Sequence, residues 1–250
     1  MDLIVCVKRV PDSAAKIKVA SDGKSIDRSG VEHVISPYDE IALERAIQLK
    51  EAAGDGSVTV VCLGPAEATK EIRQALAMGA DKAVHVKDAH GARGPLGIAK
   101  VLAATVKDRA FDALLFGKQS IDSDNSAVGI LVAQLLDLPV VSLVTKLEIA
   151  DGKATAHREA EGGTEVVEVA LPAVFTAQRG LAEPRYPSIK GIMMAKKKPI
   201  EEVEAPAPSG KLELAKLEPP PERKGGRIVG EGADAVPELV KLLRQEAKVI

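Results

Sequence analysis

The sequence predicts an α/β protein with one mostly parallel sheet covered on both faces, added antiparallel strands, and an extended C-terminal arm ending in a helix. Strand-like runs alternate with helical patterns through the first half of the chain, as in βαβ units. The 250 residues include no Trp, two Tyr and three Phe, so Val, Leu, Ile and Ala must fill the interior, as is typical of buried parallel strands.

The first half contains four expected strands connected by helices. The clearest helix start is Ser36, a hydroxyl N-cap followed by Pro37 at the first helical position and the Asp39 carboxylate at the third. Gly54 and Gly79 end the first two helices. Four crossovers in one direction imply parallel pairing. In order, we expect strand 3–7, a polar hairpin at 16–26 turned at Asp22-Gly23, a helix from Ser36 to Gly54, strand 57–63, a helix ending at Met78, strand 83–86, helix 95–106, strand 113–116 and helix 124–136.

The pattern changes after Pro139. Four further strand-like runs are expected to add antiparallel strands to the sheet, namely 140–149, 154–159, 164–170 and 173–177. Prolines mixed with charged residues between 199 and 226 indicate an extended arm with little core of its own. The arm ends in an amphipathic helix at 234–247. Its apolar face must be covered by the chain's own domain or, given the long proline-rich lead, by a second subunit.

Composition excludes several classes of protein. No apolar run is long enough to span a bilayer, and the chain opens with a strand instead of a leader, so we expect a soluble intracellular protein. A net charge of −2 and scarce aromatic residues argue against nucleic-acid binding. Cys6 and Cys62 fall in expected buried strands, which favours buried thiols over a disulfide or metal site. The four histidines lack metal-ligand spacing, and no nucleophile motif occurs, so a binding or carrier protein is expected.

Ligand chemistry is expected in the turns at the carboxyl ends of the parallel strands. The turn 117–129 brings a glycine at a strand end, then side-chain donors, then a helix start whose free amides suit an anion such as phosphate. Asp122 and Asp124 would repel a phosphate, and fit better as ribose partners, caps or ties within the loop. The alternative is that this turn only caps a helix and binds no ligand. The turns 36–39 and 62–65 could lie beside it, and no Walker loop or Gly-x-Gly-x-x-Gly motif occurs.

A second candidate site is the segment 183–198. Two prolines and a glycine argue against a regular element, yet the segment carries more apolar residues than a solvated loop usually has. Between residues 179 and 198, six basic residues and one acidic residue give a local charge of +5. The segment is either a solvated loop or a loop that docks a partner.

These residues together resemble the β subunit of electron-transfer flavoprotein over nearly the whole chain. The matching blocks are Val5-Cys6-Val7-Lys8-Arg9-Val10, Ser36-Pro37-Tyr38-Asp39-Glu40-Ile41-Ala42, 75–81, 117–122, 158–165 and 171–173. The resemblance implies a heterodimer whose α subunit holds most of a redox-active FAD. It also implies an AMP buried in this subunit, electrons accepted from acyl-CoA and related dehydrogenases, and delivery to a membrane quinone oxidoreductase. The compartment would be the bacterial cytoplasm, or the mitochondrial matrix in a eukaryote.

The resemblance also assigns residues and a division of the chain. It implies a nucleotide-binding domain at 1–198, with a recognition loop at 177–198, and an arm at 199–250 that contacts the partner subunit. The cofactor-binding positions would be Cys6, Ser36, Pro37, Tyr38, Asp39, Leu63, Gly117, Lys118, Gln119, Ser120, Ile121, Asp122, Ser123, Asp124, Asn125, Ser126, Ala127 and Val128. The docking positions would be Glu183, Pro184, Arg185, Tyr186, Ile189, Ile192, Met193, Lys196, Lys197 and Lys198, with Ile189 as apolar anchor.

The chain departs from the family pattern at a few positions. Ser36 replaces the usual Asn, Ser13 stands near the flavin where Tyr is frequent, and the loop 122–128 replaces a run richer in Asp. Part of the family binds a second FAD in place of AMP and bifurcates electrons, but its helix start and loop resemble this chain less, which favours AMP. A stand-alone adenine-nucleotide-binding regulatory module is the alternative from another functional class.

Overall fold

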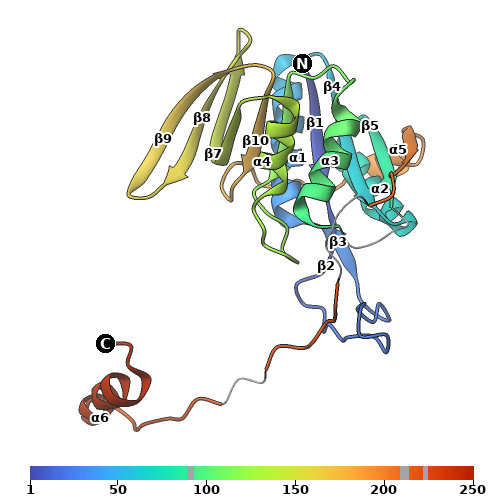
Figure 1. Cartoon of the computed structure of the whole chain (residues 1–250). Coiled ribbons are helices and arrows are strands. Elements are labelled where there is room, and N and C mark those ends of the chain that lie inside the picture. Colours follow the sequence, from blue (N-terminus) through green and yellow to red (C-terminus); the bar gives the residue numbers. More distant parts are fainter. Residues whose placement is uncertain (89–92, 209–213, 222–224) are drawn as a thin grey trace.

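A computed structural model describes residues 1–88, 93–208, 214–221 and 225–250. Within these residues the chain forms a nine-stranded sheet and a small two-stranded one (Figure 1). The order across the large sheet is β11 (Ile200–Glu204), β5 (Lys82–Lys87), β4 (Ser57–Gly64), β1 (Asp2–Val7), β6 (Ala113–Gly117), β10 (Ala173–Ala177), β7 (Val140–Ala150), β8 (Lys153–Ala160) and β9 (Gly163–Ala170). The predicted mostly parallel α/β sheet is confirmed.

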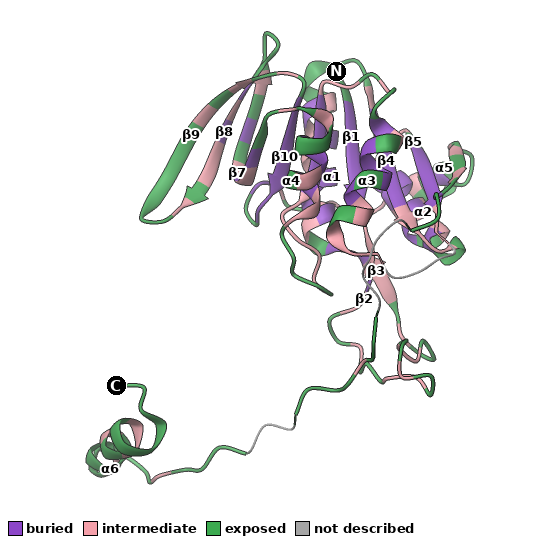
Figure 2. Ribbon diagram, in the orientation of Figure 1, coloured by how far each residue is buried: buried purple, intermediate pink, exposed green. Residues whose placement is uncertain are grey.

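Helices cover both faces of this sheet, and strand β1 shows how the sequence divides them. Leu3, Val5 and Val7 point to one face and pack with α1 (Pro37–Ala53) and α2 (Thr69–Met78), which follows the short turn η1 (Ala66–Ala68). Ile4 and Cys6 point to the other face and pack with α3 (Pro95–Val106) and α4 (Val128–Leu136). Because side chains alternate along a strand, one apolar run supplies two cores. Figure 2 shows the buried strands between the two helical layers.

The antiparallel pairing predicted after Pro139 is confirmed among β7, β8 and β9 but is wrong for β10. β10 pairs parallel with both β6 and β7, so it is an inner strand of the parallel sheet and not an added antiparallel strand. Tight turns join β7, β8 and β9, so β8 pairs antiparallel with both and is the one strand of the described sheet that runs opposite to the others. Thr176 Oγ1 accepts the Leu143 N–H at 3.1 Å where the β7–β10 register shifts. A strand's direction in the sheet depends on which distant strands it pairs with, and the local hydrophobic pattern carries no information on those partners.

The structure refines one expectation near the N-terminus and corrects one in the fourth crossover. The hairpin expected at 16–26 is present in a short form, with an antiparallel bridge between Val19 and Ile26 and the Ala20 N–H donating to the Ser25 carbonyl at 2.8 Å. The Asp22 carboxylate accepts the N–H groups of Lys24 and Ser25 in its turn. On either side of this hairpin, β2 (Arg9–Pro11) and β3 (His33–Ile35) form the small antiparallel sheet, which the sequence did not predict. Helix α4 begins at Val128 and not near Asp124, because residues 118–127 form an irregular loop with positive φ at Asp124 and Ser126.

The C-terminal segments are also more ordered than expected at two points. The extended arm expected from residue 199 opens with β11, which extends the sheet beside β5. The segment expected to lack regular structure contains the short helix α5 (Ile189–Ala195), capped by Ser188 Oγ, which accepts the Gly191 N–H at 3.0 Å. Its two prolines precede the helix, where they are tolerated.

The arm then leads away from the sheet to the turn η2 (Ala233–Ala235), helix α6 (Val236–Leu242) and the π-helical turn η3 (Leu243–Ala247) (Figure 1). This confirms the predicted C-terminal helix, whose side chains are mostly exposed (Figure 2). In the described part of the chain, no helix combines the length and the apolar composition that crossing a membrane requires.

Candidate functional site

The site is built where the ends of two strands meet the start of α1. Asp39 lies in the first turn of α1, is 7% exposed, and accepts the backbone N–H of Lys8 at 2.9 Å and that of Gly117 at 2.9 Å. Those two residues follow β1 and end β6. A side chain at Gly117 would place its Cβ 2.5 Å from Asp39 Oδ1, so only glycine allows this approach. Asp39 therefore ties the ends of two strands together.

This bonding corrects the capping role expected for the helix start. Ser36 occupies the N-cap position and its carbonyl accepts the Asp39 N–H, but no side-chain cap bond is formed there. The Ser36 Oγ is buried and has no hydrogen-bond partner among the described residues. Burial raises the pKa of Asp39 to about 7, although the N–H groups of Lys8 and Gly117 favour the charged form. The carboxylate thus serves the strand ends, not its own helix.

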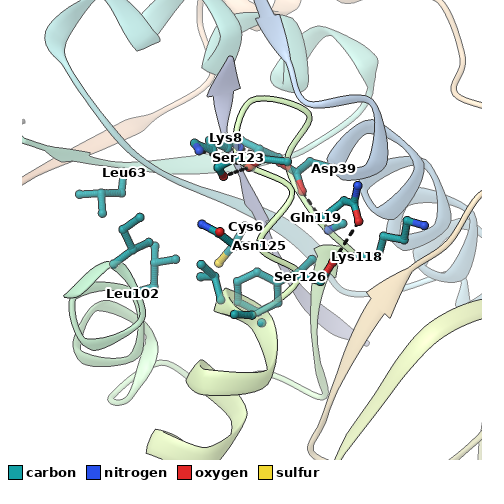
Figure 3. Close-up of a pocket in the computed structure, with 18 residues that line it drawn as sticks. Cys6, Lys8, Asp39, Leu63, Leu102, Lys118, Gln119, Ser123, Asn125 and Ser126 are labelled. Atoms are coloured by element: carbon teal, nitrogen blue, oxygen red, sulfur yellow. Dashed lines mark hydrogen bonds between the residues drawn. The ribbon is translucent and has the colours of Figure 1, made fainter. Parts of the chain in front are cut away.

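A pocket opens beside this junction, on the side covered by α3 and α4 (Figure 3). Its empty volume is about 750 Å³, including the open mouth. One wall is apolar and is formed by Leu63, Ile98, Leu102 and Phe116. The Cys6 side chain lines the pocket as well, and burial raises the pKa of this thiol well above its usual range. The pocket lies at the point where the strand order reverses, since β4 and β6 flank β1 on opposite sides.

The opposite wall is the loop between β6 and α4, which is held by its own side chains. Gln119 donates to Asp124 Oδ1 at 2.6 Å and accepts from Ser126 Oγ at 2.9 Å. Ser120 and Ser123 hydroxyls lie 3.0 Å apart. Figure 3 shows Ser123, Asn125 and Ser126 around the pocket. The loop therefore presents hydroxyl and amide groups in fixed positions.

A helix start and a lysine both line the pocket. No side chain in the described part of the chain caps α4, and Ala127, Val128 and Gly129 line the pocket, so the first N–H groups of the helix are available to an anion. Lys8 lines the pocket as well, and its Nζ pairs with Asp122 at 2.7 Å. Partial burial raises the pKa of Asp122, but hydrogen bonds from Lys8 and Ser120 outweigh it and lower that pKa overall. The pocket can hold a flat apolar group at one wall and an anionic group at the helix start.

The structure brings together most of the expected cofactor positions but not all of them. Those lining the pocket are Cys6, Asp39, Leu63, Gly117, Lys118, Gln119, Ser120, Ser123, Asn125, Ser126, Ala127 and Val128. Those outside its lining are Ser36, Pro37, Tyr38, Ile121, Asp122 and Asp124. Sequence reasoning missed Val7, Lys8, Ile98, Leu102, Phe116 and Gly129 as lining residues. Lys8 could have been found, since it directly follows a predicted strand, and Ile98 and Leu102 share one helix face four residues apart.

A second, wider cleft lies next to the pocket and is lined by several of the expected cofactor positions that the pocket does not include. It is lined by Ser13, Pro37, Ile121 and Asp122 together with Arg9, Arg28 and His33, and its volume is about 1550 Å³ including open solvent. Burial and the charge of Arg9 lower the pKa of His33. Arg9 itself pairs with the buried Glu71 of α2 at 3.1 Å. The Lys118 ammonium lies 5.0 Å from the centre of the Tyr38 ring.

The expected docking residues divide into exposed and internally bonded groups. Tyr186 is 96% exposed and Ile189 is 81% exposed, and Ile192 and Met193 are also exposed. In contrast, Arg185 forms paired hydrogen bonds of 2.8 to 3.0 Å with the carboxylates of Glu44 and Glu51 on α1. Lys198 donates to backbone carbonyls of α2 and of the turn after it. Glu183, Lys196 and Lys197 are exposed, and Pro184 is half-buried.

The fold and the pocket together define a doubly wound α/β protein with a ligand site at the carboxyl edge of its parallel strands. A family model described as "Electron transfer flavoprotein domain" matches residues 24–208. The chain is 45% identical to an electron transfer flavoprotein subunit beta of Bacillus subtilis over the whole of both chains. It is 42% identical to that subunit of Syntrophomonas wolfei, covering 100% of this chain and 98% of the relative. It is 40% identical to the human subunit, covering 97% of this chain and 98% of the relative. The chain belongs to the electron transfer flavoprotein family, as a β subunit, and the resemblance stated from its sequence is confirmed.

Proposed function

We propose that this β subunit joins an α subunit carrying FAD, accepts electrons from acyl-CoA and related dehydrogenases, and passes them to a membrane quinone oxidoreductase. We further propose that its pocket holds AMP as a structural group. The subunit would work in the bacterial cytoplasm, or in the mitochondrial matrix if its source is eukaryotic. Family membership supports an electron carrier with an α-subunit partner.

The observation that carries the AMP assignment is the pairing of an apolar wall with an uncapped helix start in one pocket. Leu63, Ile98 and Leu102 offer a surface for a purine ring. The first N–H groups of α4 suit a single phosphate, and the loop hydroxyls suit a ribose. Among the described residues, no Gly-rich loop extends this cradle for further phosphates. The pocket residues therefore fit a nucleoside monophosphate.

The second cleft supports a shared FAD. It is wide and open, as expected of a surface that a second subunit must complete, and Arg9, Arg28 and His33 line it. Ser13 offers a small polar group here where an aromatic ring is frequent in relatives, so this chain would contribute little stacking to the flavin. Bound FAD would supply the redox chemistry, and this subunit would hold it in place and limit the access of water.

The exposed side chains of α5, with Tyr186 just before it, support docking of the dehydrogenase. Tyr186, Ile189, Ile192 and Met193 form an apolar surface, and Lys196 and Lys197 add positive charge beside it. An apolar centre with charged surroundings is the usual anatomy of a transient interface. The surface is separate from the pocket, so it governs which protein docks and not which nucleotide is bound.

The proposal is tested by the cofactors of the assembled complex. The chain is co-expressed with its α subunit, purified, denatured, and the released nucleotides are separated and quantified. We expect a yellow complex that releases AMP and FAD in equal amounts. Two FAD and no AMP would show a bifurcating subunit, and a stable monomer that binds ATP without flavin would support a regulatory module.

A further inference from the structure

The docking helix α5 is attached to α2 by two basic side chains that bond in opposite directions. Lys198, which follows α5, donates through Nζ to the carbonyl of Leu76 at 2.9 Å and to that of Ala80 at 2.5 Å. Arg73, on α2, donates through Nη1 to the carbonyl of Ala195 at 2.5 Å and to that of Lys198 at 2.8 Å. Each side chain therefore satisfies carbonyl groups at the C-terminal end of the other helix.

The face of α5 that meets α2 is built from small residues. Gly191 and Ala195 are four residues apart and so lie on one side of the helix. A Cβ at Gly191 would come within 2.5 Å of the Ala77 carbonyl oxygen of α2, and Ala195 is 2% exposed. The two backbones thus approach closely along this face, and the large apolar side chains of α5 are left on its outer side, where Ile189 and Met193 are exposed.

Lys198 bonds to the protein's own backbone, unlike the two lysines before it. Lys196 and Lys197 are exposed, and the described structure gives their side chains no hydrogen bond or ion pair. Lys198 is half-buried, and this burial lowers the pKa of its ammonium group. The carbonyls at the end of α2 compensate a cation there, because the C-terminal end of a helix carries partial negative charge. The basic triplet 196–198 is therefore not one uniform patch.

We propose that Arg73 and Lys198 are positioning residues that form a reciprocal clamp, which holds α5 in one orientation on α2 and so presents a preformed docking face to the dehydrogenase. The identity of the docked protein rests on the proposed function, whereas the clamp does not. A helix of seven residues is too short to be stable by itself in water, so it needs such attachments. A preformed face also avoids the entropy cost of ordering the segment during each encounter.

Hydrogen–deuterium exchange of the assembled α/β complex tests the clamp directly. Lys198→Met and Arg73→Met should each accelerate exchange of the α5 amides at 192–195 by about tenfold or more, since each removes two charge-assisted hydrogen bonds. Lys198→Arg should restore most of the protection, and Lys196→Met is the matched control that should leave it unchanged. Wild-type exchange rates in both Met variants would overturn the clamp.

Electron-transfer kinetics with an acyl-CoA dehydrogenase separate this inference from the function on which it rests. Lys198→Met should raise the KM for the dehydrogenase and leave kcat and flavin content unchanged. The rise in KM should be the same at low and at high ionic strength. Replacing Lys196 and Lys197 by Gln should instead slow association mainly at low ionic strength, because exposed charges are screened within about 8 Å at physiological salt. Faster exchange without a change in KM would support the clamp and contradict docking through α5.

If a Met variant does not assemble with the α subunit, Gly191→Ala provides a second route. Its added methyl group would push α5 away from the Ala77 carbonyl without removing a charge. We expect faster exchange at 192–195 and a raised KM in this variant too. Unchanged exchange would show that α5 does not depend on its close contact with α2 and would count against the proposal.

Discussion

The Asp39 carboxylate accepts the backbone N–H of Gly117 at 2.9 Å, across 78 residues of sequence. The other oxygen of the same carboxylate accepts the N–H of Lys8, which follows the first strand. One buried acidic side chain thus joins the start of α1 to the ends of two neighbouring strands, directly beside the pocket. The pocket's shape depends on this junction, because its lining includes all three residues.

Replacing Gly117 with Ala should damage the pocket first. The added Cβ would lie 2.5 Å from Asp39 Oδ1 and 2.6 Å from Tyr38 Cβ, so the start of α1 or the end of β6 must move. Overpacking of this kind typically costs ~1–3 kcal/mol of unfolding free energy. We expect less AMP per FAD in the purified complex, as measured by nucleotide release. Gly163→Ala, with nothing within 4 Å of the added Cβ, is the control and should keep its AMP. Equal AMP content in the two variants would contradict this role for Gly117.

The buried Asp39 should make stability depend on pH. Burial raises its pKa to about 7 from a usual value of 3.8, so between these limits the folded protein keeps a proton that the unfolded chain has released. The free energy of unfolding should therefore fall as pH rises through this window, by at most ~1.4 kcal/mol per pH unit. Asp39→Asn removes the titration and should flatten this decline, which urea unfolding between about pH 5 and pH 7 can measure. Asp151→Asn, in an exposed turn, should follow the wild type. A decline as steep in Asp39→Asn as in the wild type would assign the effect to other groups.

Ile189 should act as the apolar anchor of docking. It is 81% exposed on α5, and truncating a central apolar anchor commonly costs more than ~1 kcal/mol of binding. Ile189→Ala should slow electron acceptance from the dehydrogenase by about tenfold at sub-saturating concentrations, with flavin content intact, as followed by stopped-flow absorbance. Leu135→Ala, at an exposed position of α4, removes a similar surface elsewhere and should transfer electrons normally. Unchanged kinetics in Ile189→Ala would remove Ile189 as the anchor.

The local signals in the sequence located most helices and strands correctly. Helix α3 spans Pro95–Val106 as predicted, because proline at its start and an apolar periodicity act within the segment itself. The same holds for α1, which begins at Pro37 and ends before Gly54. The start of α4 was missed, since the polar residues after Gly117 suit a helix start and also a loop held by its own side chains.

The sequence by itself therefore determined the fold class, most helices and strands, the strand end where the pocket forms, and the family. Only the tertiary structure decided the parallel insertion of β10, the sheet position of β11, the role of Asp39 and the internal use of Arg185 and Lys198. The physical reason is range: propensity, capping and periodicity act over a few residues, whereas these features join groups far apart in the chain. A lysine in a basic triplet looks the same in sequence whether it faces solvent or the end of a helix.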